Sequence, residues 1–241
     1  VGVVKADGSG HLPTPPGEHV IAPDEELLIL AEDAHILLAP YSGPLRADQV
    51  AIPNAAVAEK PVEHMLVLGW NEKIFPIIQE FDSYVGSGSS VTLVNTLSVE
   101  QREAEFRDKC DEFKNISVRH QVGDFTSRTL LEQIQPQRYP TVMVLGDSAV
   151  VADEADATEA AVTRAIIALL LLRDFRQRAG VASQEVCSEI LDPRNRDLAA
   201  TTEIDDIVIS NEMVSMVLAQ VTNEPRVRPV LEDLFQSEGS E

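Results

Sequence analysis

The feature that most constrains the fold is a change of pattern at residue 64, after which short apolar runs alternate with helical stretches. Such runs are typical of strands buried in a parallel sheet, and the stretches between them are typical of crossover helices. Strands are predicted at residues 65–69, 91–95, 116–124, 141–147, 184–191 and 206–210. Helices are predicted at residues 71–84, 98–112, 126–134 and 211–222, with a further long one ending at Gly180. The sequence therefore predicts an α/β fold with a doubly wound, mainly parallel sheet.

Residues 1–38 have a different pattern, in which short apolar runs are separated by turns rich in glycine and proline. Strands are predicted there in "VGVVKADGSG", "HVI", "ELLILAE" and "HILLA". Residues 39–63 hold four prolines and little periodicity, which indicates a linker and a domain boundary. We therefore predict a small β-rich lobe at 1–38, and a Rossmann-like unit with following helices at 64–241. Because the chain enters an apolar run at Val1, we expect a piece of a longer protein.

The stretch "MLVLGWNEKIFPIIQEF", residues 65–81, has the strand, glycine and helix of a dinucleotide-binding unit. That unit needs several glycines, because the backbone must approach the pyrophosphate closely. Here Gly69 stands alone and is followed by the bulky Trp70. A dinucleotide site also prefers an acidic residue after the second strand, where this chain has Asn95. The sequence therefore disfavours NAD as a cofactor.

Ligands of doubly wound sheets bind in a crevice at the carboxyl ends of the strands, so the residues there are the candidates for ligand binding. They are Gly69, Trp70, Asn71, Asn95, Asp124, Asp147 and Ser148. The stretch "GDSAVVADEADA" adds candidates for a cation site, because hard divalent cations such as Ca²⁺ need several oxygen ligands at one point. They are Asp147, Asp153, Glu154 and Asp156. The spacing is not that of an EF-hand, and acidic residues also stabilise a helix N-terminus, so both interpretations stay open.

Composition narrows the function classes. The formal charge of −21, from 40 acidic and 19 basic residues, argues against nucleic acid as a partner, because phosphate neutralisation needs clustered Lys and Arg. The two cysteines have no metal-ligand spacing, and the five histidines share no spacing with each other. The longest apolar run, residues 165–172, is too short to cross a membrane. No nucleophile or general base can be assigned, so we predict no catalytic residues and no enzyme.

Several motifs together resemble the Castor/Pollux family of cation channels. They are "LGWNEKIFPIIQEFDSYVGSGSSVTLVN", "LLLLRDFRQR", "SEILDPRNRDL", "DIVISNEMVSMVLAQV" and "VLEDLFQSEGSE". The resemblance covers residues 64–241, and it implies the Rossmann-like N-lobe of a regulator-of-conductance (RCK) domain. Residues 1–38 resemble the β-rich C-terminal lobe of a preceding RCK domain.

The resemblance implies a cytosol-facing gating domain, the soluble cytoplasmic-side portion of a membrane-embedded channel. The expected partners are other subunits of the same tetrameric channel, arranged as a homo-oligomeric ring, and the pore domain of the same protein. It suggests Ca²⁺ as the sensed ligand and explains the "GW" turn as a family trait. Two alternatives stay open: an NAD-binding oxidoreductase, and an assembly domain without ligand whose interface uses residues 214–221 and 225–236.

Overall fold

The fold is taken from a computed structural model, which describes residues 2–5, 11–12, 19–29, 60–147, 154–181, 183–190, 193–195 and 206–235. The chain divides into two compact units. One comprises residues 59–217, and the other comprises residues 1–58 together with 218–241. The predicted division into a lobe at 1–38, a linker at 39–63 and a unit at 64–241 stays a prediction.

The larger unit is built on a six-stranded parallel sheet with the strand order β6-β5-β4-β7-β8-β9. The strands are β4 His64–Leu68, β5 Ser89–Asn95, β6 Ile116–Val122, β7 Thr141–Val144, β8 Glu185–Glu189 and β9 Asp206–Val208. The order reverses between β4 and β7, which pair side by side. This is the topology of a doubly wound sheet, so the predicted α/β Rossmann-like fold is confirmed. The reversal places a topological switch point where the first βα turn faces the end of β7.

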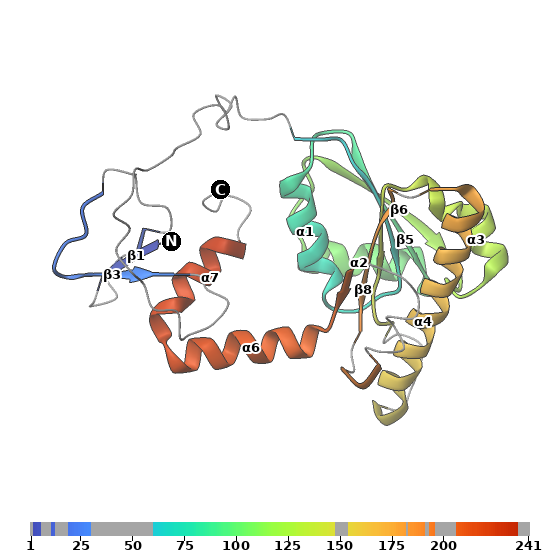
Figure 1. The fold of residues 1–241 in the computed structure, drawn as a ribbon. Helices are drawn as coiled ribbons and strands as arrows, with labels where there is room; N and C mark the ends of the chain where they lie inside the picture. Colours follow the sequence, from blue (N-terminus) through green and yellow to red (C-terminus); the bar gives the residue numbers. More distant parts are fainter. Residues whose placement is uncertain are drawn as a thin grey trace. The chain divides into compact units, whose positions relative to one another are not determined.

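Helices cover both faces of this sheet (Figure 1). They are α1 Ile74–Tyr84, α2 Val99–Lys109, α3 Arg128–Ile134 and α4 Glu154–Ala179. Alternate residues of each strand point to opposite faces: Val67 packs with α1 and α2, whereas Leu66 and Leu68 pack with α3 and α4. The two apolar clusters fix the helices on the sheet, and the carboxyl ends of the strands remain as the edge where polar residues gather.

Local sequence signals set several of the helix ends. Ser98 and Gln101 form the predicted capping box at the start of α2. Gly180 ends α4 with a left-handed φ of 64°, a conformation that glycine adopts without strain. The first helix was predicted from residue 71, but α1 begins at Ile74. A turn precedes it, because the Asn71 side-chain oxygen accepts a hydrogen bond from the N–H of Lys73 at 2.9 Å.

The smaller unit contains a three-stranded antiparallel sheet with the order β2-β1-β3. Its strands are β1 Gly2–Lys5, β2 His11–Leu12 and β3 Glu25–Leu28. The strand predicted in "HVI" is wrong, because residues 19–21 lead into a turn instead. The Glu25 carboxylate holds that turn by accepting hydrogen bonds from the His19 ring at 2.9 Å and the N–H of Ala22 at 2.8 Å. The strand predicted in "HILLA" lies outside the described residues.

The remaining described elements are η1 Pro136–Arg138, η2 Pro193–Asn195, α6 Ser210–Asn223, η3 Pro225–Val227 and α7 Arg228–Phe235. The division between the two units falls within α6. None of the helices that the structure describes is both long and apolar enough to cross a membrane.

Candidate functional site

The first βα turn is shaped by contact between backbones. Gly69 has a φ of 101°, and its N–H donates to the carbonyl of Val94 at 3.0 Å. A Cβ at this position would lie 2.4 Å from the carbonyl oxygen of Leu145, so only glycine fits against the end of β7. Trp70 then turns into the core, where its ring meets those of Phe75 and Phe106 edge-on at 5.7 and 5.6 Å. The lone glycine of the sequence therefore serves strand packing, and the tryptophan serves the core.

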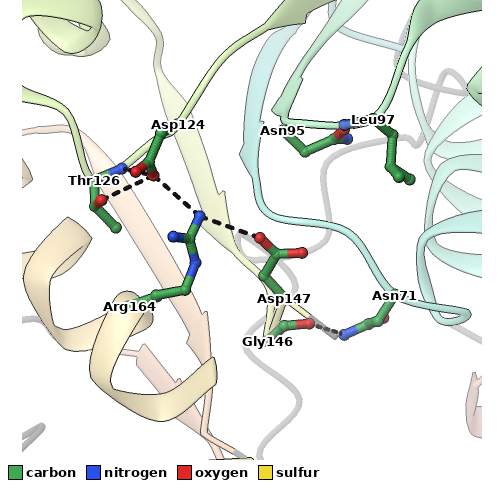
Figure 2. Close-up of polar contacts among 8 residues, drawn as sticks. All are labelled: Asn71, Asn95, Leu97, Asp124, Thr126, Gly146, Asp147 and Arg164. Atoms are coloured by element: carbon green, nitrogen blue, oxygen red, sulfur yellow. Dashed lines mark hydrogen bonds and ion pairs between the residues drawn. The ribbon is translucent and has the colours of Figure 1, made fainter. Parts of the chain in front are cut away.

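Asn71 crosses the switch point. Its side-chain amide donates to the carbonyl of Gly146 at 2.8 Å and to the carboxylate of Glu189 at 2.8 Å (Figure 2 shows the first contact). Glu189 ends β8 and is buried, and its carboxylate also receives the Lys73 ammonium and the N–H of Gly146, the latter at 3.3 Å. We call these four residues, Asn71, Lys73, Gly146 and Glu189, the Glu189 cluster. It ties together the turns that follow β4 and β7 and the end of β8.

Two predicted carboxylates converge on one guanidinium. The Nη2 atom of Arg164, on α4, lies 3.0 Å from Asp124 Oδ1 and 3.3 Å from Asp147 Oδ2 (Figure 2). Asp124 follows β6 and Asp147 follows β7, so this contact spans the carboxyl edge of the sheet over β5 and β4. The guanidinium also lies over the Phe125 ring, 4.6 Å from its centroid. The site thus contains a cation of the chain itself, held between two acids.

The two acids have different surroundings. The Asp147 side chain is completely buried, whereas that of Asp124 is 47% exposed. Burial alone would raise the pKa of Asp124. Hydrogen bonds from the N–H and hydroxyl of Thr126, together with the charge of Arg164, outweigh this and hold the pKa below its ordinary value. Asp124 is therefore ionised at neutral pH, and its present cation partner is Arg164.

Asn95 lies apart from this pair. It is fully buried at the end of β5, and its side-chain oxygen accepts a hydrogen bond from the N–H of Leu97 at 2.8 Å (Figure 2). Its Nδ2 atom has no hydrogen-bond partner among the described residues. In a dinucleotide site the side chain at this position faces the ribose, but here it holds the loop that leads to α2.

The other predicted cation ligands are described only in part. Ser148 and Asp153 lie outside the described residues, while Glu154 and Asp156 open α4 with side chains that are likewise outside the description. Within the part of the chain that the structure describes, no group of three or more His, Cys, Asp or Glu side chains is arranged to hold a metal ion. The Ca²⁺ site therefore stays a prediction, with Asp147 as its described member.

Sequence comparison relates the chain to ion channels. No protein-family model matches it. Ion channel CASTOR from Lotus japonicus is 29% identical over 256 residues, which cover 94% of this chain and 29% of that protein. Ion channel POLLUX from the same plant is 29% identical over 270 residues, which cover 99% of this chain and 29% of that protein. The resemblance to the Castor/Pollux family is confirmed. The chain spans under a third of the length of these Castor/Pollux relatives, which are named as channels and not as enzymes.

Among solved structures, the chain is similar to the NAD(P)-binding domain of an exopolyphosphatase-related protein from Archaeoglobus fulgidus. The identity is 13% and the TM-score 0.39, with 68% of this chain and 98% of that one covered. It is also similar to GsuK bound to ADP, at 12% identity and a TM-score of 0.38, covering 63% of this chain and 34% of that one.

Three charged residues of the site were not predicted: Lys73, Arg164 and Glu189. For Arg164 the sequence does carry a signal, because it is a single cation in the otherwise apolar part of the α4 sequence, "AAVTRAIIALLLL". A charge on a buried helix face usually has an internal partner of opposite sign. Glu189 carries a similar signal as an acid near the end of the predicted strand "QEVCSEIL". The partner of each residue depends on the strand order, which the sequence pattern did not provide.

Proposed function

We propose that this chain is a cytosol-facing regulatory domain of a cation channel of the Castor/Pollux type. It binds a ligand at the carboxyl edge of its sheet and transmits the resulting movement to the pore, without catalysis. The named function of the relatives supports the channel context. The observation that carries the proposal is the convergence of Asp124 and Asp147 on Arg164, because it concentrates charged groups at the edge where ligands of this fold bind.

Ca²⁺ is the ligand that we propose for this edge. A divalent cation with oxygen ligands would compete with Arg164 for the two carboxylates, and its double charge compensates both. Further oxygen atoms are available. The Thr126 hydroxyl lies 2.8 Å from Asp124 Oδ1, and the acids at the start of α4 follow Asp147 closely in the sequence. Binding would therefore move Arg164 and with it α4. The ligand would then have a higher affinity for the arrangement with Arg164 displaced than for the one with Arg164 in place, and regulation requires such a difference.

Transmission to the pore needs partners, which we propose to be further subunits of the same tetrameric channel, arranged as a ring. A specific observation also favours the second candidate function, assembly without a ligand: α6 exposes a set of large apolar side chains. They are Met213, Val214, Met216 and Leu218, with 46–61% of each side chain exposed. Large exposed apolar surfaces commonly mark protein interfaces. The two functions are compatible within one ring.

An NAD-dependent oxidoreductase is a weaker candidate. The position of the pyrophosphate in such enzymes is next to the first βα turn. Here the turn lies against the backbone of Leu145, and the Asn71 amide spans from it to Gly146. The missing side chain of Gly69 therefore makes room for the backbone that follows β7, and it leaves no space for a phosphate close to the turn.

The test is a calorimetric titration of the chelator-stripped chain with Ca²⁺, with Mg²⁺ as the control ion. Asp124→Asn and Asp147→Asn are compared with Asp111→Asn, which changes an exposed acid in the loop that leads to the amino end of β6. We expect a saturable Ca²⁺ signal that is weakened by the first two substitutions and retained by the third. A signal that is absent, or equally strong with Mg²⁺, or unchanged in both site variants of confirmed fold, would reject Ca²⁺ at this edge.

A further inference from the structure

We propose that the Glu189 carboxylate takes the place of a bound anion at the switch point. With its hydrogen bonds formed, it acts as a latch that couples the candidate cation site to strands β8 and β9. The regulatory meaning of this latch rests on the proposed function, but its existence does not. It consists of the Glu189 cluster defined above. Four observations support it: the convergence of donors, the double attachment of Gly146, the connection to β9, and the space beside the carboxylate.

The donors converge as they do around a bound anion. Three donors from two different turns, the Asn71 amide, the Lys73 ammonium and the Gly146 N–H, meet a carboxylate that is only 6% exposed. Lys73 is the residue before the first turn of α1, and that first turn has no acidic residue of its own. At this turn Glu189 is held by the side chains of Asn71 and Lys73. The chain thus fills from within a position where other proteins of this fold place a ligand.

Gly146 is attached on both sides. Its N–H donates to Glu189 and its carbonyl accepts from Asn71, so the peptide units around it cannot move without breaking a buried hydrogen bond. The next residue, Asp147, carries the carboxylate that contacts Arg164. A change at Asp147 is therefore passed to the Glu189 cluster through a single residue of backbone.

The latch continues into the far half of the sheet. Glu189 is the last residue of β8, and the N–H of the following Ile190 donates to the carbonyl of Val208 at the end of β9 at 2.9 Å. After β9 the chain enters α6. A movement of Glu189 consequently reaches the strand that leads directly into the exposed apolar helix of the proposed assembly surface.

There is also space for such a movement. A cavity of about 160 Å³ adjoins the latch, and Lys73 and Glu189 line one part of it. Its other walls are apolar and are formed by Ile77, Met143, Leu145, Cys187 and Val208. Closely packed interiors resist displacement. A cavity next to the buried Glu189 carboxylate therefore gives its side chain room to rearrange without disturbing the surrounding core.

The latch is tested with Glu189→Gln, which keeps the size of the side chain and removes its charge. Glu185→Gln is the matched control, since Glu185 is the exposed first residue of the same strand. Amide hydrogen exchange is followed at residues 69–76 and 185–190, and the fluorescence of Trp70, the only tryptophan, reports on the first turn. We expect exchange on the order of tenfold faster at both segments in Glu189→Gln only, because hydrogen bonds to a charged group are the stronger ones.

Lys73→Met provides a second, milder variant that leaves the Asn71 and Gly146 contacts in place, and we expect it to accelerate exchange in the same two segments. Coupling to the cation site is tested by combining Glu189→Gln with Asp147→Asn. Their effects on exchange should be non-additive, whereas Glu189→Gln combined with Asp111→Asn should be additive. Exchange equal to that of Glu185→Gln, or additive effects in both combinations, would overturn the latch. These readouts need no Ca²⁺, so a failed Ca²⁺ titration rejects the proposed ligand and leaves the latch to be judged separately.

Discussion

Replacing Arg164 by methionine is the sharpest test of the charge arrangement at the carboxyl edge. Methionine keeps an unbranched apolar stem against the Phe125 ring and removes the guanidinium between Asp124 and Asp147. Breaking a buried ion pair by removing one partner costs roughly 3–5 kcal/mol, because the remaining charge stays in a poorly solvated place. Asp147 fits this case with a fully buried side chain, whereas the half-exposed Asp124 can be solvated by water. We therefore expect a loss near the lower limit, about 3 kcal/mol.

Urea unfolding followed by the fluorescence of Trp70 measures this loss directly, because the chain has a single tryptophan and it lies in the core. In a domain of this size the same loss lowers the melting temperature by about 6–12 °C. Arg178→Met is the matched control on the same helix, since Arg178 is 65% exposed and pairs with Asp174 at the surface. We expect that control to lose less than about 1 kcal/mol. Equal losses in the two variants would refute the view that Asp147 depends on an internal cation.

Three further substitutions test other parts of the structure. Gly69→Ala would place a Cβ 2.4 Å from a backbone carbonyl at a φ of 101°, so we expect it to lower the free energy of unfolding by at least about 2 kcal/mol in urea. Asp82→Ala would leave three backbone N–H groups at residues 114–116 without their acceptor, and a loss of about 2–4 kcal/mol should appear in the same assay. Burial, and then the charge of Arg102, lower the pKa of His120 below its ordinary value. The unfolded chain then binds the proton first, so stability should fall as the pH drops below about 6.5, and His120→Gln should reduce this fall in unfolding curves measured from about pH 7.5 to 5.5.

The sequence predicted the sheet well because buried parallel strands are nearly continuous apolar runs. It also located the start of α2 and the end of α4, because the capping box at Ser98 and the glycine at position 180 act through local geometry. In the small unit the pattern was insufficient. "HVI" has an apolar composition suited to a strand, but the carboxylate of Glu25, six residues after His19, folds it into a turn.

At the site, the sequence identified the strand ends but not the directions of their side chains. Within a strand, successive side chains point to opposite faces of the sheet, so their directions can be predicted. This regularity ends at Gly69, where the positive φ turns the chain. Consequently Trp70 enters the core while the adjacent Asn71 reaches across to β7. The partners Arg164 and Glu189 come from elements far along the chain. The order β4-β7-β8 brings Glu189 to the first turn, whereas Arg164 meets the acids that follow β6 and β7.

Both charged clusters place a group of the chain where a ligand of this fold could bind: a guanidinium between two carboxylates, and a carboxylate among three donors. A ligand that must displace such a group binds more weakly than it would to an empty site, in proportion to the population of the displaced state. The same competition makes binding informative, because a ligand shifts an equilibrium only by the difference in its affinity for the two states. An empty site filled without rearrangement would bind more tightly and signal nothing. Internal occupation is therefore a physical reason for a dinucleotide-type fold to act as a sensor, since each displaced group is already bonded to an element that can move.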